Sequence, residues 1–169
     1  MYKTGSVVSY GSSGVCRIDG EIRQRVKGEM KQYLVLKPVF RDNSTVYIPL
    51  DNNKLMSRLK PVITDTEAEE VISAMSDCDE RWISDDGQRT VLFREILSEG
   101  DVKRVAMMVH SLYMHRKSQL AKGRKLHASD EHFFKDAEQL LFDQLAHALG
   151  IQPDEVGGYL TRRLAARLA

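Results

Sequence analysis

The hydrophobic pattern of this chain changes at Pro61, and that change limits the folds that the sequence allows. Before Pro61, short runs rich in Val, Ile and Tyr alternate with turns that contain Gly, Ser and Asn; these runs are SVVSY, GVCRI, QYLVLKPVF and STVYIPL. From Thr64 onward, apolar residues recur at helical spacing. The pattern predicts an α+β protein with one domain over residues 1–60 and a helical domain over residues 64–169.

The strand-like part predicts a small, strongly bent sheet or barrel, because its strands are short and numerous for their total length. Lys27-Gly28-Glu29 marks a further turn between two strands. Pro38 and Pro49 are expected at strand ends or edges, since proline cannot donate a hydrogen bond to a neighbouring strand.

The second part predicts an all-α bundle of four or five helices. Capping boxes, glycine stops and apolar periodicity place the helices at about residues 64–75, 88–98, 102–122, 129–149 and 153–168. The buried stripe of the third helix is expected to hold Val102, Val105, Ala106, Val109, Leu112 and Tyr113. In the fourth helix the same periodicity selects Phe133, Phe134, Ala137, Leu140, Leu141, Leu145 and Ala148.

The composition is that of a soluble globular protein, with 42% hydrophobic and 29% charged residues. We expect a cytoplasmic protein without a membrane partner, because no apolar run approaches the ~18 residues of a spanning helix and the first residues lack a signal-peptide core. The two cysteines, Cys16 and Cys78, lie far apart in sequence and suggest buried free thiols.

Charge is strongly segregated along the chain. Residues 1–63 carry eleven Lys or Arg against five Asp or Glu, residues 64–101 carry three against twelve, and residues 102–125 carry seven against none. The last block predicts either a phosphate-binding surface or a solvated helix face that pairs with the acidic segment. Its members on the expected polar side or in the following loop are Lys103, Arg104, Lys117, Lys122, Arg124 and Lys125.

No pattern of catalytic or metal-binding residues stands out. The histidine pairs His110/His115 and His127/His132 are each five residues apart, which does not match the i, i+4 spacing of a helical zinc site. The carboxylates Asp85 and Asp86 lie in solvated surroundings rather than in an apolar pocket. We therefore expect no enzyme, no metal and no cofactor.

The order of motifs resembles the CarD/CdnL family of transcriptional regulators, whose N-terminal module is shared with transcription-repair coupling factor. The motifs are KTGSVVSYGSSGVCRI, KGEMKQYLVLKP and VYIPLDN in the first part. In the second part they are a Trp in a polar segment, LSEGDV, LAKGRK and SDEHFFKDAEQLLFDQLAHALG, which resemble the form found in Firmicutes members. Together they cover roughly residues 3–160.

The resemblance implies that a Tudor-like, SH3-like barrel docks on the RNA polymerase β subunit by pairing an edge strand. The docking residues implied are Val46, Tyr47, Ile48 and Pro49, supported by Arg23 and Arg25. Tyr47 stands where actinobacterial members carry a basic residue, so docking here is expected to depend more on apolar contact. An ordinary core strand with an outward Tyr remains the alternative.

The resemblance also implies that Trp82 enters the minor groove of promoter DNA at the fork of the transcription bubble, which would stabilise the open complex. Phosphate contacts would come from Arg81, Arg89 and the basic block, with little base specificity. The carboxylates of Asp85 and Asp86 beside Trp82 do not fit this interpretation, and a bundle anchor or a plain surface residue remain alternatives for the tryptophan.

The sequence thus predicts a non-enzymatic bacterial transcription regulator that bridges RNA polymerase and promoter DNA and binds as a monomer. The alternative from another class is a protein–protein adaptor, in which the barrel binds some other partner. Recovery of the polymerase β subunit in a pull-down distinguishes the two.

Overall fold

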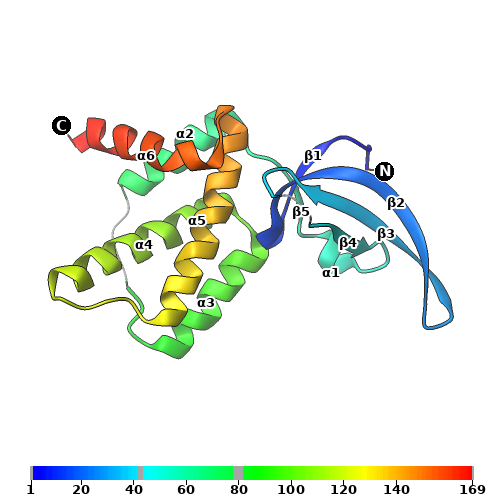
Figure 1. Cartoon of the computed structure of the whole chain (residues 1–169), viewed down its shortest axis with the longest axis horizontal. Coiled ribbons are helices and arrows are strands. Elements are labelled where there is room, and N and C mark those ends of the chain that lie inside the picture. The colour runs from blue at the N-terminus through cyan, green and yellow to red at the C-terminus, as the bar shows by residue number, and fades with distance from the viewer. Residues whose placement is uncertain (1, 42–43, 78–81, 169) are drawn as a thin grey trace.

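A computed structural model describes residues 2–41, 44–77 and 82–168, and it has the expected α+β architecture (Figure 1). An antiparallel sheet lies beside a bundle of helices along the long axis of the molecule. The strands are β1 (Val7–Tyr10), β2 (Gly14–Val26), β3 (Glu29–Pro38), β4 (Val46–Pro49) and β5 (Leu59–Pro61). The helices are α1 (Asn53–Met56), α2 (Asp65–Ser76), α3 (Asp86–Glu99), α4 (Val102–Ala121), α5 (Ala128–Leu149) and α6 (Pro153–Leu168), with a 3₁₀ turn η1 at Gly11–Ser13.

The sheet is open, which is one of the two forms, bent sheet or barrel, that the sequence predicts. Its strand order is β4-β3-β2-β1-β5, so β4 and β5 form its two edges, and no pair joins them within the described residues. These edge strands have only four and three residues and offer few groups for closure. The strong bend that the sequence predicts is present, and the arrangement is barrel-like only in that sense (Figure 1).

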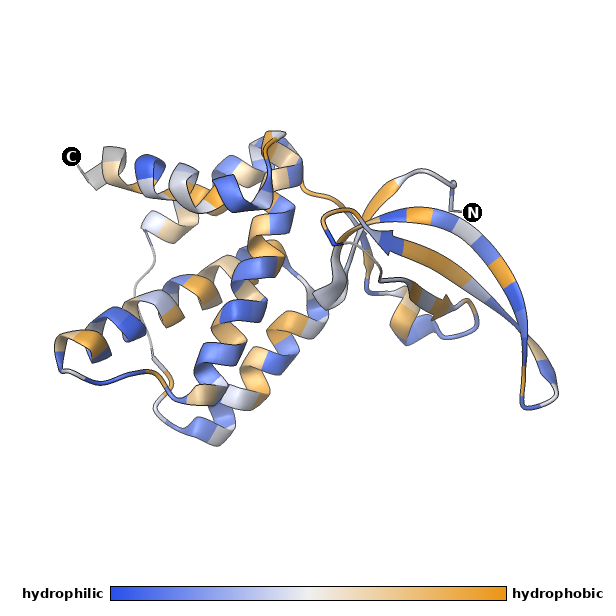
Figure 2. Cartoon of the chain, viewed as in Figure 1, coloured by the Kyte–Doolittle hydropathy of each residue, from blue (hydrophilic) through white to orange (hydrophobic). Residues whose placement is uncertain are grey.

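The two central strands form a hairpin much longer than the sequence runs suggested. β2 continues past GVCRI through the polar stretch DGEIRQR to Val26, because each of these residues from Gly20 onward pairs with β3. The predicted turn joins the strands at Lys27 and Gly28, whose φ angles of 51° and 87° suit a two-residue hairpin loop. Pro38 and Pro49 end their strands, as predicted. Bands of apolar and polar residues alternate along the hairpin (Figure 2).

Five helices, α2 to α6, form the bundle within the described residues, close to their predicted positions. The Thr64–Glu67 capping box starts α2, the Asp101 side chain caps α4, and left-handed glycines at 100 and 150 end α3 and α5. Tyr113 is 48% exposed, so its assignment to the core is wrong: neighbouring helices do not cover α4 completely toward its C-terminal half. None of the described helices is long and apolar enough to cross a membrane.

The sheet and the bundle have separate hydrophobic clusters, yet buried polar contacts join them. The bundle cluster includes Leu112, Leu140 and Leu141, whereas the sheet cluster includes Ile18 and Leu34. Between the two, the Gln144 side-chain amide donates to the Ser9 hydroxyl at 2.5 Å. Arg41 donates to the buried carboxylate of Asp143 at 3.3 Å. Burial raises the pKa of the Asp143 carboxyl, while the Arg41 charge lowers it.

Cys16 is a buried free thiol in the sheet cluster, as predicted. Cys78 and Arg81, the other predicted thiol and one of the predicted phosphate contacts, lie outside the described residues. The short helix α1 and the strand β5 were not predicted from the sequence. Each has four residues or fewer, so neither leaves a readable periodicity.

Candidate functional site

The first candidate site is the free edge of β4. Val46 and Ile48 pair with Leu36 and Leu34 of β3, and the Leu50 N–H donates to the Gln32 carbonyl at 3.0 Å. Antiparallel pairs alternate between bonded and non-bonded positions, so this bond assigns the β3-facing groups to Val46 and Ile48. Tyr47 therefore directs its N–H and C=O away from the sheet.

The predicted docking residues divide between the two faces of the sheet. Ile48 is fully buried and Val46 packs against the same core. The main-chain groups of Ile48 face β3, so Ile48 offers a partner neither its side chain nor its N–H and C=O. Tyr47 is 54% exposed and lies on the opposite face. Arg23 and Arg25 are exposed on β2, but the pairing register puts them on the face of Ile48. The structure therefore does not gather the arginines and Tyr47 on one face.

The face that carries Tyr47 holds apolar residues that sequence reasoning missed. Val35 pairs with Tyr47, and Ile22, which is 39% exposed, pairs with Tyr33. Because side chains alternate along a strand, Tyr33 and Val35 share a face that excludes the buried Leu34. The order of residues in KQYLVLK could have indicated that Tyr33 and Val35 share a face. The centre of this run is entirely apolar, however, so no alternation of polar and apolar residues is visible there.

The second candidate site surrounds Trp82, whose indole is partly buried against the bundle rather than exposed on a polar loop. His115 of α4 stacks on it, with ring centroids 3.7 Å apart and planes 4° from parallel. Phe93 of α3 meets it edge-on at 6.4 Å. The Arg89 guanidinium carbon lies 4.7 Å from the ring centroid. The His115 imidazole is stacked so closely on one face of the indole that the Arg89 guanidinium has no room on that face. The two groups therefore cover opposite faces of the indole.

Arg89 was predicted to contact phosphates, but its side chain is 4% exposed and its donors are engaged inside the protein. Its Nε and Nη2 donate to the two carboxylate oxygens of Asp130 at 3.0 and 2.9 Å. Nη1 donates to the Ile83 carbonyl at 2.8 Å, and Nη2 also donates to Asp86 at 2.6 Å. Burial lowers the pKa of this guanidinium, but the two carboxylates outweigh it and raise the pKa overall. Arg89 is therefore not available as a phosphate contact.

Asp85 and Asp86 have structural partners that explain their place beside the tryptophan. The Asp85 carboxylate caps α3 by accepting the N–H of Gln88 at 2.8 Å. The Asp86 carboxylate accepts from Arg89, and this hydrogen bond and charge hold its pKa below the usual range. Neither acid needs a nucleic-acid partner to account for it. Both side chains nevertheless stay at the surface.

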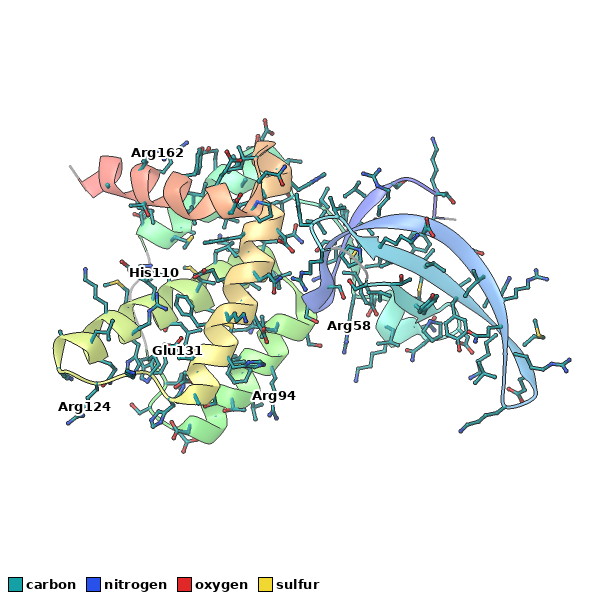
Figure 3. The ribbon with its side chains drawn as sticks, viewed as in Figure 1. Arg58, Arg94, His110, Arg124, Glu131 and Arg162 are labelled. Carbon is teal, nitrogen blue, oxygen red and sulfur yellow. The ribbon has the colours of Figure 1, made fainter. Side chains whose placement is uncertain are left out.

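The basic block divides between two sides of α4. Successive residues are rotated by about 100°, which puts Arg104 and Lys122 on the side of His115, and Lys103 and Lys117 on another. Arg104 forms an ion pair with Glu99, whereas Lys122 is exposed at the end of the helix. Arg124 and Lys125 follow in the exposed loop, and Arg124 lies at the end of the bundle away from the sheet (Figure 3).

A groove of about 290 Å³ extends from Trp82 between α3 and α4. Its wall is largely apolar, with Phe93, Met107 and Met108, and Arg104 also lines it. Within the described part of the chain, no group of three or more His, Cys, Asp or Glu side chains is arranged to hold a metal ion.

The fold defines an α+β protein in which an open sheet presents a free edge strand and a helical bundle carries a packed tryptophan. Residues 2–60, which are 59 of the 169, match the family model described as CarD-like/TRCF RID domain. This match of the N-terminal segment agrees with the resemblance that the sequence motifs predicted. The family is one of non-catalytic interaction domains and implies a transcription-related function through RNA polymerase.

Proposed function

We propose that this chain is a transcription regulator that docks on the RNA polymerase β subunit through the edge of β4. Its bundle then contacts promoter DNA at the upstream edge of the bubble and stabilises the open complex. The observation that carries the proposal is the outward N–H and C=O of Tyr47, on a free edge strand inside the matched domain.

Docking of this kind adds a strand of the partner to the sheet. The main-chain groups of Tyr47 provide two hydrogen bonds, and its exposed ring adds apolar contact beside Tyr33 and Val35. Pro49 has no N–H to donate, so the hydrogen bonds that this edge offers to a partner come mainly from Tyr47. A short edge also protects the free protein from uncontrolled pairing with other strands.

Replacing Tyr47 with proline is expected to weaken binding to the β subunit more than replacing it with alanine. Alanine removes the ring only, whereas proline also removes the outward N–H, which is worth ~1 kcal/mol or about fivefold in affinity. Proline is tolerated on the solvent side of an edge strand, so the sheet should remain folded. The measurement is titration of each variant with purified β subunit, alongside thermal unfolding. Equal affinities of the two folded variants would contradict strand pairing at Tyr47.

Contact with DNA is supported by the surroundings of Trp82. Lys122 lies on the same side of α4 as the stacked His115, and Arg124 and Lys125 follow directly. Such cations bind the phosphate backbone without reading sequence. Because both faces of the indole are covered, we propose that its edge, rather than its flat face, meets the minor groove. Anchoring on polymerase raises the local concentration of DNA, so weak contacts suffice.

Trp82→Ala is expected to shorten the lifetime of open complexes without reducing affinity for the β subunit. Tyr113→Ala is the matched control, since Tyr113 is another partly exposed aromatic residue of the bundle but projects from a different side of α4. Lifetimes are measured by challenge of preformed complexes with a competitor, and unfolding curves check that both variants are folded. If folded Trp82→Ala and Tyr113→Ala give the same lifetime as wild type, Trp82 has no role at the DNA.

A further inference from the structure

Arg89 links two helices through a buried bidentate ion pair. It projects from α3 and donates through Nε and Nη2 to the Asp130 carboxylate on α5, at 3.0 and 2.9 Å. The side chains of both residues are less than 5% exposed. The planar guanidinium matches a carboxylate in this geometry, and a lysine ammonium cannot reproduce it.

The same guanidinium also holds the segment that carries Trp82. Nη1 donates to the Ile83 carbonyl at 2.8 Å, one residue after the tryptophan, and the guanidinium lies over the indole. Asp86 accepts from Nη2 on the side toward solvent. Residues 82–85 form neither helix nor strand, so side-chain contacts such as these fix their path.

A buried ion pair is a poor source of net stability, because removing both charges from water costs about as much as their attraction returns. The pair instead fixes the relative orientation of the segments that it joins, because each guanidinium N–H holds one acceptor in place. Here the donors orient α5, the main chain after Trp82 and the first turn of α3 relative to one another.

We propose that Arg89 is a positioning residue that holds the Trp82 indole against His115 with one edge left outward. The meaning of this geometry at DNA rests on the proposed function above, but the positioning itself is a property of the free protein. Arg89 thereby determines which part of the tryptophan a partner can touch, without touching the partner itself.

The test uses Trp82 as its own reporter, because it is the only tryptophan in the chain. Arg89→Lys should shift Trp82 fluorescence emission to longer wavelength and increase its quenching by acrylamide, since a lysine cannot bond Asp130 and Ile83 together. Arg94→Lys is the matched control: it makes the same change on the same helix at an exposed position (Figure 3). Far-ultraviolet circular dichroism checks that the helices are intact. Unchanged emission and quenching in folded Arg89→Lys would overturn the proposal.

A second variant keeps the test decisive if Arg89→Lys does not fold. Arg89→Met combined with Asp130→Met removes both buried charges together and leaves neither unpaired, yet it also removes the bond to Ile83. The same fluorescence shift is expected, and its absence would again overturn the proposal. Open-complex lifetime separates the two claims. A fluorescence shift with a shortened lifetime supports both, whereas a shift with an unchanged lifetime supports the positioning role and contradicts the DNA role of Trp82.

Discussion

Gly100→Ala is expected to reduce the free energy of unfolding by about 2–5 kcal/mol, since two separate penalties combine. Gly100 ends α3 with a φ of 69°, a conformation that costs an alanine ~1–2 kcal/mol. An added Cβ would also lie 2.9 Å from the Gly11 carbonyl oxygen and 3.0 Å from its Cα. These are backbone atoms of η1, so relief requires the sheet and the bundle to move apart, at ~1–3 kcal/mol.

Gly150→Ala separates the two penalties. Gly150 ends α5 with a φ of 68°, but an added Cβ there would meet no atom within 4 Å from the described residues beyond its chain neighbours. It should therefore show the conformational cost alone. Urea unfolding of both variants gives the comparison. The additional loss of unfolding free energy in Gly100→Ala over Gly150→Ala is the cost of the steric conflict where sheet and bundle approach closely. Equal losses at the two positions would show that this approach relaxes without cost.

Asp130→Ala is expected to cost about 3–5 kcal/mol, because it leaves the Arg89 guanidinium buried without its main partner. Asp86 remains bonded to Arg89, but its carboxylate is 73% exposed and cannot follow the guanidinium inward. The loss should also release the link between α3 and α5. Unfolding in urea monitored by circular dichroism provides the measurement.

Asp136→Ala is the control for Asp130, on the same helix. Asp136 is 47% exposed and lies 3.6 Å from the imidazole of His132, a surface arrangement worth well under ~1 kcal/mol. The two variants remove the same chemical group from α5 and differ only in burial and partner. If Asp130→Ala lowers the free energy of unfolding no more than Asp136→Ala does, the Arg89 guanidinium finds another partner when Asp130 is removed.

The features predicted correctly from sequence are the local ones. The capping box at Thr64, the turn at Lys27-Gly28 and the glycine stops depend on residues within a few positions of each other. The long second half of β2 was missed, because DGEIRQR forms a strand only through its pairing with β3. Strand pairing is decided by distant residues, and periodicity does not report it.

The candidate site shows the same division. The edge position of β4 followed from the family resemblance, but only the pairing register shows that Tyr47 faces away from Arg23 and Arg25. The burial of Arg89 was hidden because its partner Asp130 lies 41 residues away. The role of Asp85 could have been predicted from the sequence, because an aspartate just before a helical run is a typical N-cap. The prediction placed the start of the helix at Gln88, three residues after Asp85, and so missed this cap.

The contacts that join Ser9 to Gln144 and Arg41 to Asp143 make the folding of the sheet and of the bundle interdependent. A ligand that binds only the folded sheet therefore stabilises the helices too, by ~2.7 kcal/mol when it is present at 100 times its dissociation constant. The melting temperature of the helical signal thus becomes a measure of occupancy at the β4 edge, although the ligand binds the sheet and not the bundle.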